Sequence, residues 1–381
     1  MIALARRAAA LALLATLAGC SMLPSWFGSG ADKPKPAELP PNVALIQVRP
    51  AWTARIGEIG FPLSVNVSGT TLAVASSSGE VAQLEVAGGR QLWRASAGGA
   101  ISAGVGSDGK LTSVITSSNE VVTFGANGQQ AWRQKLGAQA YTAPFVAAGR
   151  VFVLAADRSV TAFDGQTGRR LWSQQRPGEP LVLRQSGVML AVGDTLVVGL
   201  AGRLVGLNPL NGSVRWEAPI ATPRGTNDVE RLVDLVGTVS RVGTSVCARA
   251  FQARVGCIDA EQGTVAWTKP AAGAEGLNGD ERFVFGTESD GRVIAWRRDN
   301  GERAWTSERL QYRSLTAPLV LGRSVILGDG TGLVHLLSRE DGTPLNRLTT
   351  DATGIAAAPV VAGNTLVVVT RGGGIYGFVP E

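Results

Sequence analysis

Residues 142–172 read TAPFVAAGRVFVLAADRSVTAFDGQTGRRLW. Four short runs of apolar and β-branched residues alternate here with turns that contain Gly, Asp or Ser, and the runs are 145–147, 151–154, 160–163 and 169–172. Runs of this length and composition predict strands joined by tight turns. The stretch therefore predicts one four-stranded antiparallel sheet whose last strand carries Trp172.

The same ending recurs along the chain, where a Gly is followed four residues later by a Trp or, once, by an Asn. The seven pairs are Gly89–Trp93, Gly128–Trp132, Gly168–Trp172, Gly212–Trp216, Gly263–Trp267, Gly301–Trp305 and Gly342–Asn346. A period of about 40 residues with four strands per unit is typical of a β-propeller. We expect each Trp to pack between neighbouring blades, because a single blade cannot bury both of its faces alone.

The two ends of the chain decide the number of blades. The last unit supplies only three strand-like runs, whereas the run from Ile46 to Thr53, which contains Trp52, has no unit of its own. An N-terminal strand that completes the last blade would close the ring and remove two exposed sheet edges. The sequence thus predicts an all-β fold, an eight-bladed β-propeller of four-stranded antiparallel blades over 44–381. Seven blades is the alternative, if the irregular unit around 220–258 is not a full blade.

The N-terminus has the pattern of a bacterial lipoprotein signal peptide. Arg6 and Arg7 precede a short apolar core, and Leu17-Ala18-Gly19-Cys20 resembles a lipobox, whose Cys is lipidated and becomes the first mature residue. The alternative is an ordinary signal peptide with an incidental Cys. We predict a signal peptide over 1–19, lipidation at Cys20, and a flexible tether over 20–43, which is rich in Pro, Gly, Ser and Lys. Because Ser21 rather than Asp follows Cys20, the resemblance implies an outer-membrane anchor that faces the periplasm.

Charge and residue usage argue against nucleic-acid binding and catalysis. The formal net charge is +6, but no basic run in the predicted propeller is longer than Arg297-Arg298, which is no nucleic-acid footprint. The only histidine, His335, lies in an apolar run, so we interpret it as a strand residue rather than a ligand. Acidic residues such as Asp164 fall mainly in turns, where they bend or cap the chain. The sequence therefore predicts no catalytic set, no metal site and no cofactor.

Two of the three cysteines fall in one unit. When this unit is aligned with residues 142–172, Cys247 and Cys257 take the positions of Phe152 and Ala162, on either side of one hairpin turn. In an oxidising compartment such as the periplasm this placement is compatible with a disulfide, and two separate buried thiols are the alternative.

The lipobox, the tether and the eight predicted blades, seven of which are marked by a Trp, together resemble the BamB family, lipoproteins of the outer-membrane β-barrel assembly machine. The resemblance covers essentially the whole chain. Two stretches are its more specific motifs: Pro180-Leu181-Val182-Leu183-Arg184 is similar to the family's Leu-x-Leu-Arg loop, and Glu230-Arg231-Leu232-Val233-Asp234 to its Arg-Leu-x-Asp stretch.

In that family these loops dock on the periplasmic domains of the barrel-inserting subunit, BamA. The resemblance implies that Leu181, Leu183, Arg184 and Asp234 contact this partner, as one patch on one rim of the propeller. It also implies that the chain works with the machine's other lipoproteins and with unfolded outer-membrane clients. The family often has a second acid two residues after Asp234, where this chain has Val236.

Alternatives remain at this stage. Leu181 and Leu183 could pack under the loop, and Arg184 could pair with Asp234 within the chain, which would make both residues structural. The repeat is shared with quinone-dependent dehydrogenases, which hold a quinone over Ca²⁺ on such a propeller. That enzyme class often has adjacent cysteines, which this chain lacks. A generic peptide-binding propeller is the third possibility.

Overall fold

The computed structural model describes residues 34–177, 181–228 and 230–381. The predicted signal peptide, the lipidation site Cys20, most of the predicted tether and Pro180 lie outside this part. The compact unit comprises Pro36–Glu381. In the described residues the regular elements are strands, and no helix there has the length and apolar character needed to span a membrane.

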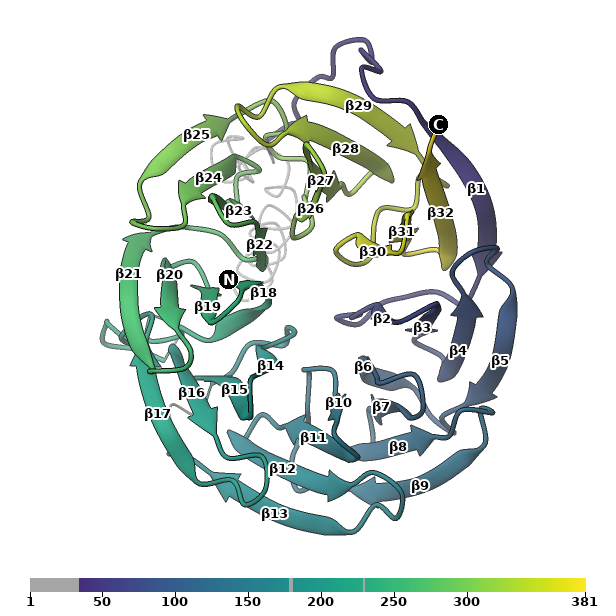
Figure 1. Ribbon diagram of the computed structural model, residues 1–381, viewed down its shortest axis with the longest axis vertical. Helices are drawn as coiled ribbons and strands as arrows, with labels where there is room; N and C mark the ends of the chain where they lie inside the picture. The colour runs from purple at the N-terminus through teal and green to yellow at the C-terminus, as the bar shows by residue number, and fades with distance from the viewer. Residues whose placement is uncertain (1–33, 178–180, 229) are drawn as a thin grey trace, which may run out of the picture. The chain divides into compact units, whose positions relative to one another are not determined.

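Eight four-stranded antiparallel sheets form the ring shown in Figure 1. The strands of blades one to four are β2 (Asn66–Ser68), β3 (Thr71–Ala75), β4 (Glu80–Glu85), β5 (Gln91–Ser96); β6 (Ile101–Ser107), β7 (Thr112–Thr116), β8 (Glu120–Phe124), β9 (Gln130–Lys135); β10 (Phe145–Ala147), β11 (Arg150–Leu154), β12 (Ser159–Asp164), β13 (Arg170–Gln175); and β14 (Met189–Val192), β15 (Thr195–Leu200), β16 (Arg203–Leu207), β17 (Val214–Pro219).

The strands of blades five to eight are β18 (Leu235–Val242), β19 (Ser245–Ala250), β20 (Arg254–Asp259), β21 (Thr264–Pro270); β22 (Leu277–Gly279), β23 (Phe283–Thr287), β24 (Val293–Arg297), β25 (Arg303–Ser307); β26 (Leu319–Leu321), β27 (Ser324–Gly328), β28 (Leu333–Ser338), β29 (Pro344–Thr349); and β30 (Val360–Ala362), β31 (Thr365–Val369), β32 (Gly374–Pro380) with β1 (Val48–Arg55). The predicted eight blades are confirmed. The seven-blade alternative is wrong, because β18–β21 form a complete sheet.

The repeated Trp and Gly residues join neighbouring blades at the outer rim. Trp132 of blade two is 7 % exposed and lies on Gly168 in the last turn of blade three, where an added Cβ would come within 2.6 Å of the indole. Gly168 has a φ of +71°, so it satisfies both the turn and the close approach. The same contact is made by the pairs Trp52–Gly89, Trp93–Gly128, Trp172–Gly212, Trp216–Gly263, Trp267–Gly301 and Trp305–Gly342. The expected packing of Trp between blades is confirmed.

The ring closes through the two ends of the chain. In Figure 1 the N-terminal β1 lies beside the C-terminal β32, and the two pair antiparallel from Val48↔Pro380 to Arg55↔Gly374. Because this outer strand comes from the other end of the chain, no turn joins it to β32, and a Trp at position 346 would have no turn Gly to pack on. Asn346 stands there instead, and its Nδ2 donates to the Ile46 carbonyl at 2.6 Å.

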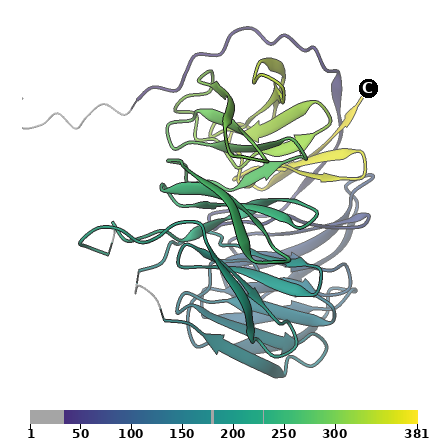
Figure 2. The ribbon, with the colours of Figure 1, turned by 60° about the vertical axis from the view of Figure 1, so that its left-hand side comes forward.

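One face of the propeller carries the connections that lead from the outer strand of each blade to the inner strand of the next. Figure 2 shows the connections into β14 and into β18 protruding on the same side of the ring. The residues singled out at 181–184 and at 234 therefore emerge on one face, from connections into adjacent blades.

Candidate functional site

A partly buried ion pair joins the two candidate stretches. Asp234 ends the connection into β18, and its Oδ1 accepts a hydrogen bond from Arg158 Nη1 at 3.0 Å. Its Oδ2 accepts one from the backbone amide of Leu183, also at 3.0 Å. Arg158, in the turn between β11 and β12, further donates through Nη2 to the Leu181 carbonyl at 3.3 Å. One cation and one carboxylate therefore hold the backbone of the loop at residues 181 and 183.

The far end of this loop is also fixed. The Gly187 amide donates to Thr142 Oγ1 at 2.9 Å, and Gln185 Nε2 donates to the Ala274 carbonyl at 2.8 Å. The Gly237 amide donates to the Ser186 carbonyl at 2.9 Å. Since backbone groups of Leu181, Leu183, Ser186 and Gly187 are hydrogen-bonded to neighbouring segments, this stretch is held on the surface of the ring.

The side chains of the candidate residues differ in what they offer to a partner. Leu181 is 38 % exposed and Arg184 is exposed, with its guanidinium carbon 5.9 Å from the centre of the Tyr141 ring. Leu183 is half-buried, whereas Asp234 is turned into the chain with 17 % of its side chain exposed. The alternative in which Arg184 pairs with Asp234 is wrong, because Asp234 pairs with Arg158.

A small pocket of about 50 Å³ lies beneath this loop. Tyr141, Arg158, Leu183, Asp234 and Val236 are among the residues that line it. Val236, at the position where the resembling family often has an acid, is 1 % exposed within β18. A carboxylate at this buried position would lose most of its contact with water, which is costly unless a partner compensates for it.

Arg158 and Tyr141 were not singled out by the sequence analysis. Arg158 acts on residues more than twenty positions away, so no local motif marks it. A signal was nevertheless present, because Arg158 occupies a turn position that is Gly79 in blade one and Gly332 in blade seven.

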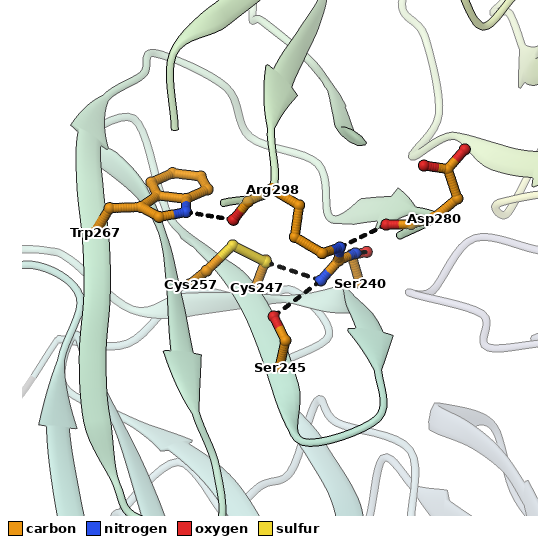
Figure 3. Close-up of a disulfide and its surroundings, with 7 residues drawn as sticks. All are labelled: Ser240, Ser245, Cys247, Cys257, Trp267, Asp280 and Arg298. Carbon is orange, nitrogen blue, oxygen red and sulfur yellow. Dashed lines mark hydrogen bonds between the residues drawn. A yellow bond between two sulfur atoms is a disulfide. The ribbon is translucent and has the colours of Figure 1, made fainter. Parts of the chain in front are cut away.

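Cys247 and Cys257 are directly opposed in the β19–β20 register and form a disulfide in the middle of blade five. Both are buried, at 0 % and 1 % exposure. Figure 3 shows Arg298 of blade six beside the disulfide, where its Nη1 donates to Cys247 Sγ at 3.2 Å and to Ser245 Oγ at 3.1 Å. Burial lowers the pKa of Arg298, and Asp280 partly opposes this effect. The disulfide cross-links β19 and β20 of blade five, whose first strand, β18, begins directly after Asp234.

His335 is a structural residue. It is 3 % exposed, and its Nε2 lies 3.0 Å from Asp329 Oδ2, which also accepts from Arg313 Nε at 2.8 Å. Burial raises the pKa of Asp329, but the hydrogen bonds from His335 and Arg313 outweigh burial and hold the pKa well below its usual range. Among the described residues no cluster of three His, Cys, Asp or Glu is arranged to hold a metal ion.

The inner strands surround a central cavity of about 480 Å³, lined mainly by small and apolar residues. Glu275 and Arg371 are the charged side chains on its wall. Burial raises the pKa of Glu275, while the positive charges of Arg249 and Arg371 act in the opposite direction. Glu275 and Arg371 thus place side chains of opposite formal charge on the wall of this cavity.

Comparison with known proteins places this geometry in a wider context. The family model described as outer membrane protein assembly factor BamB matches residues 64–307. The chain is similar to the outer membrane protein assembly factor BamB of Burkholderia pseudomallei, with 39% identity over 88% of this chain and 89% of the relative. It is similar to that of Bordetella pertussis, with 38% identity over 97% and 96%.

Solved structures share the fold. The crystal structure of BamB from Moraxella catarrhalis has a TM-score of 0.80 and 22% identity, and covers 87% of this chain and 99% of that one. A quinohemoprotein alcohol dehydrogenase from Pseudomonas putida has a TM-score of 0.70 and 14% identity, and covers 88% and 77%. Because both an assembly factor and an enzyme share the propeller, the fold alone does not assign a function.

Proposed function

The chain belongs to the family of outer membrane protein assembly factor BamB, and on that premise we propose that it is a non-enzymatic scaffold of the β-barrel assembly machine. In this role it binds the periplasmic domains of the barrel-inserting subunit, BamA, and supports the folding and insertion of outer-membrane proteins. Its proposed partners include the other lipoproteins of the machine, and its proposed clients are unfolded outer-membrane proteins.

The observation that carries this proposal is the fixed loop with an exposed leucine and an exposed arginine on one face. Leu181 offers apolar surface that loses contact with water on binding, and Arg184 offers a planar donor group for a carboxylate or backbone carbonyl of the partner. Because the backbone of residues 181–187 is already held by the propeller, little conformational entropy is lost on binding.

Anchoring follows from the sequence. We propose that Cys20 is lipidated and holds the protein at the outer membrane, with the propeller in the periplasm. Replacement of Cys20 by Ala is expected to abolish incorporation of labelled fatty acid, since the thiol is the acylation site that the lipobox offers. Labelled lipid on the Cys20→Ala protein would contradict the anchor.

The competing function is that of a quinone-dependent dehydrogenase. It has to be tested because the fold is similar to that of a quinohemoprotein alcohol dehydrogenase. The lone histidine is an unsuitable general base, because its side chain is buried and its Nε2 lies 3.0 Å from Asp329 Oδ2. Purified protein is expected to show no quinone absorbance and no dye reduction with alcohols after quinone and Ca²⁺ are added. Turnover under those conditions would favour the enzyme.

Capture of the partner tests the site directly. The periplasmic domains of BamA are immobilised, and binding of the wild type is compared with that of a Leu181→Ala, Arg184→Ala double variant. We expect at least tenfold weaker binding with an unchanged melting transition, because both side chains are exposed and cost little stability. The matched control is Leu210→Ala with Arg170→Ala, which removes a 65 % exposed leucine and an exposed arginine on other turns and strands. Equal capture by both double variants would remove the site assignment.

A further inference from the structure

The turn between the second and third strands of blade three has a non-glycine residue at a position with a positive φ angle. Between the second and third strands of a blade, the residue whose amide donates to the carbonyl three positions earlier is Gly79, Gly291, Gly332 or Gly373 in four of the blades. Their φ angles are +103°, +86°, +86° and +84°. Left-handed conformations are open to Gly at no steric cost, so Gly is the residue that this turn prefers.

Blade three has Arg158 at this position. Its amide makes the same bond, to the Ala155 carbonyl at 3.0 Å, and its φ is +62°. A long side chain is uncommon in this conformation, and an observed outlier of this kind is a reason to look for a role. Arg158 is also only 6 % exposed, so its side chain is not an unconstrained surface group.

The guanidinium of Arg158 forms hydrogen bonds to two separate connections. Nη1 donates to Asp234, at the entrance to blade five, and Nη2 donates to the Leu181 carbonyl, in the connection into blade four. Asp234 in turn receives the Leu183 amide. A planar fork with several donors can serve two acceptors in fixed directions, whereas the single ammonium of a lysine cannot do so with the same geometry. Arg158 therefore links the turn of blade three to two further connections.

We propose that Arg158 is a positioning residue for the partner site: it holds Asp234 and the Leu181 carbonyl so that Leu181 and Arg184 are presented on the surface. This inference rests on the proposed function. It also gives Asp234 a defined part, because Asp234 acts through the Leu183 amide rather than by touching the partner. The contact surface is then Leu181, Leu183 and Arg184, and the pair Arg158–Asp234 lies beneath it as its support.

The test uses the full-length protein with Arg158 changed to Gly, the residue that the turn prefers. The Leu183 amide reports directly on the support, because Asp234 accepts its hydrogen. We expect Arg158→Gly to speed hydrogen exchange at Leu183 by about tenfold or more, since the carboxylate loses the cation that fixes it. The Gly187 amide, which is held by Thr142, is the internal control and should keep its rate.

Capture by the immobilised BamA domains supplies the second readout. Binding is expected to fall about tenfold in Arg158→Gly, with an intermediate value for Arg158→Lys, while β11 and β12 keep their exchange rates. Without Arg158 the Asp234 carboxylate loses its ion-pair partner, and this unpaired charge could unfold the loop locally. The double variant Arg158→Gly, Asp234→Asn removes that charge, so it checks that the weaker capture does not come from such local unfolding. Arg215→Ala is the matched control, because it removes an arginine from another ion pair, with Asp194, whose side chain is 84% exposed.

The outcomes separate this inference from the function on which it rests. Unchanged exchange at Leu183 in Arg158→Gly would overturn the positioning role. The positioning role would also be overturned if Arg158→Gly showed faster exchange at Leu183 but full capture, while the Leu181→Ala, Arg184→Ala variant lost capture. Full capture by both variants would instead overturn the proposed partner site itself.

Discussion

The rim of the propeller and the face that carries the inter-blade connections join neighbouring blades by different chemistry. At the rim, an indole such as Trp132 packs on a glycine such as Gly168 of the next blade, and the contact repeats around the ring. On the connection face, the guanidinium of Arg158 and the carboxylate of Asp234 join blade three to the entrance of blade five. The repeated apolar contact determines the ring, whereas the unrepeated polar contact shapes one place on its surface.

The largest expected effect tests the rim. Trp132→Ala removes a side chain that is 7 % exposed and leaves a gap against Gly168, so we expect a loss of about 3–5 kcal/mol in the free energy of unfolding. The measurement is chemical denaturation followed by fluorescence and circular dichroism. Capture of the BamA domains should be retained at temperatures where the variant is folded, because the rim does not reach the loop at 181–184. Selective loss of capture by the folded variant would break the distinction between rim and connection face.

The contacts at the rim were predictable from sequence because the same Trp–Gly contact repeats from blade to blade. Each blade needs the same wedge, so Trp93, Trp132 and Trp172 follow their turn glycines at a constant spacing that sequence alone reveals. Closure by β1 was also predictable, because the last unit lacked a strand and the Trp52 segment lacked a unit.

The support of the candidate site could not be predicted in the same way. Arg158 and Asp234 are 76 positions apart, and their pairing depends on how two connections approach on a closed ring. Resemblance identified Asp234 as part of the site, but it did not reveal that this carboxylate faces the chain. The available sign was Arg158 at a turn position that is Gly in four other blades, and it indicated an unusual residue without identifying its partner.

The disulfide gives a smaller expected effect. Cys247 and Cys257 enclose a loop with a sequence separation of 10. Chain-entropy reasoning for a loop of this size predicts that reduction lowers the free energy of unfolding by about 2–3 kcal/mol. The measurement compares denaturation with and without a thiol reductant, and the Cys247→Ala, Cys257→Ala double variant should show no response to the reductant. Two alkylatable thiols in the non-reduced periplasmic protein would contradict the bond.

The pH dependence of the free energy of unfolding distinguishes charged contacts from apolar ones. Asp329, in a turn of blade seven, has a pKa held below its usual range by His335 and Arg313, despite the opposing effect of burial. Its carboxylate therefore stabilises the folded protein fully above the ordinary carboxyl pKa of about 3.9, and this contribution is lost as the pH falls below that value. We expect Asp329→Asn to cost about 1.5–3 kcal/mol at pH 7 and progressively less in acid. The cost of Trp132→Ala should stay constant over the same range, and an Asp329→Asn cost that did not shrink would contradict the assignment.

The smallest expected effect concerns the one rim position where the repeat departs from Trp. Asn346 is 8 % exposed, and its Oδ1 accepts a hydrogen bond from Asn42 Nδ2 at 2.9 Å, just before the closing strand β1. Asn42 Nδ2 also donates to the Arg347 carbonyl at 3.1 Å. Neutral hydrogen bonds contribute about 0.5–1.5 kcal/mol each, and this pair lies at the edge of the ring, so Asn42→Ala should scarcely move the global transition. Because the contact precedes Val48, which pairs with Pro380 at the end of the β1–β32 ladder, its loss should appear instead as faster amide exchange at this end of the ladder. The control is Arg170→Ala on the outer strand of blade three, which should leave exchange at β1 unchanged. If Asn42→Ala cost as much as Trp132→Ala, the polar junction would be equivalent to the indole wedge, and the absence of a turn glycine in blade eight would no longer explain why Asn replaces Trp at position 346.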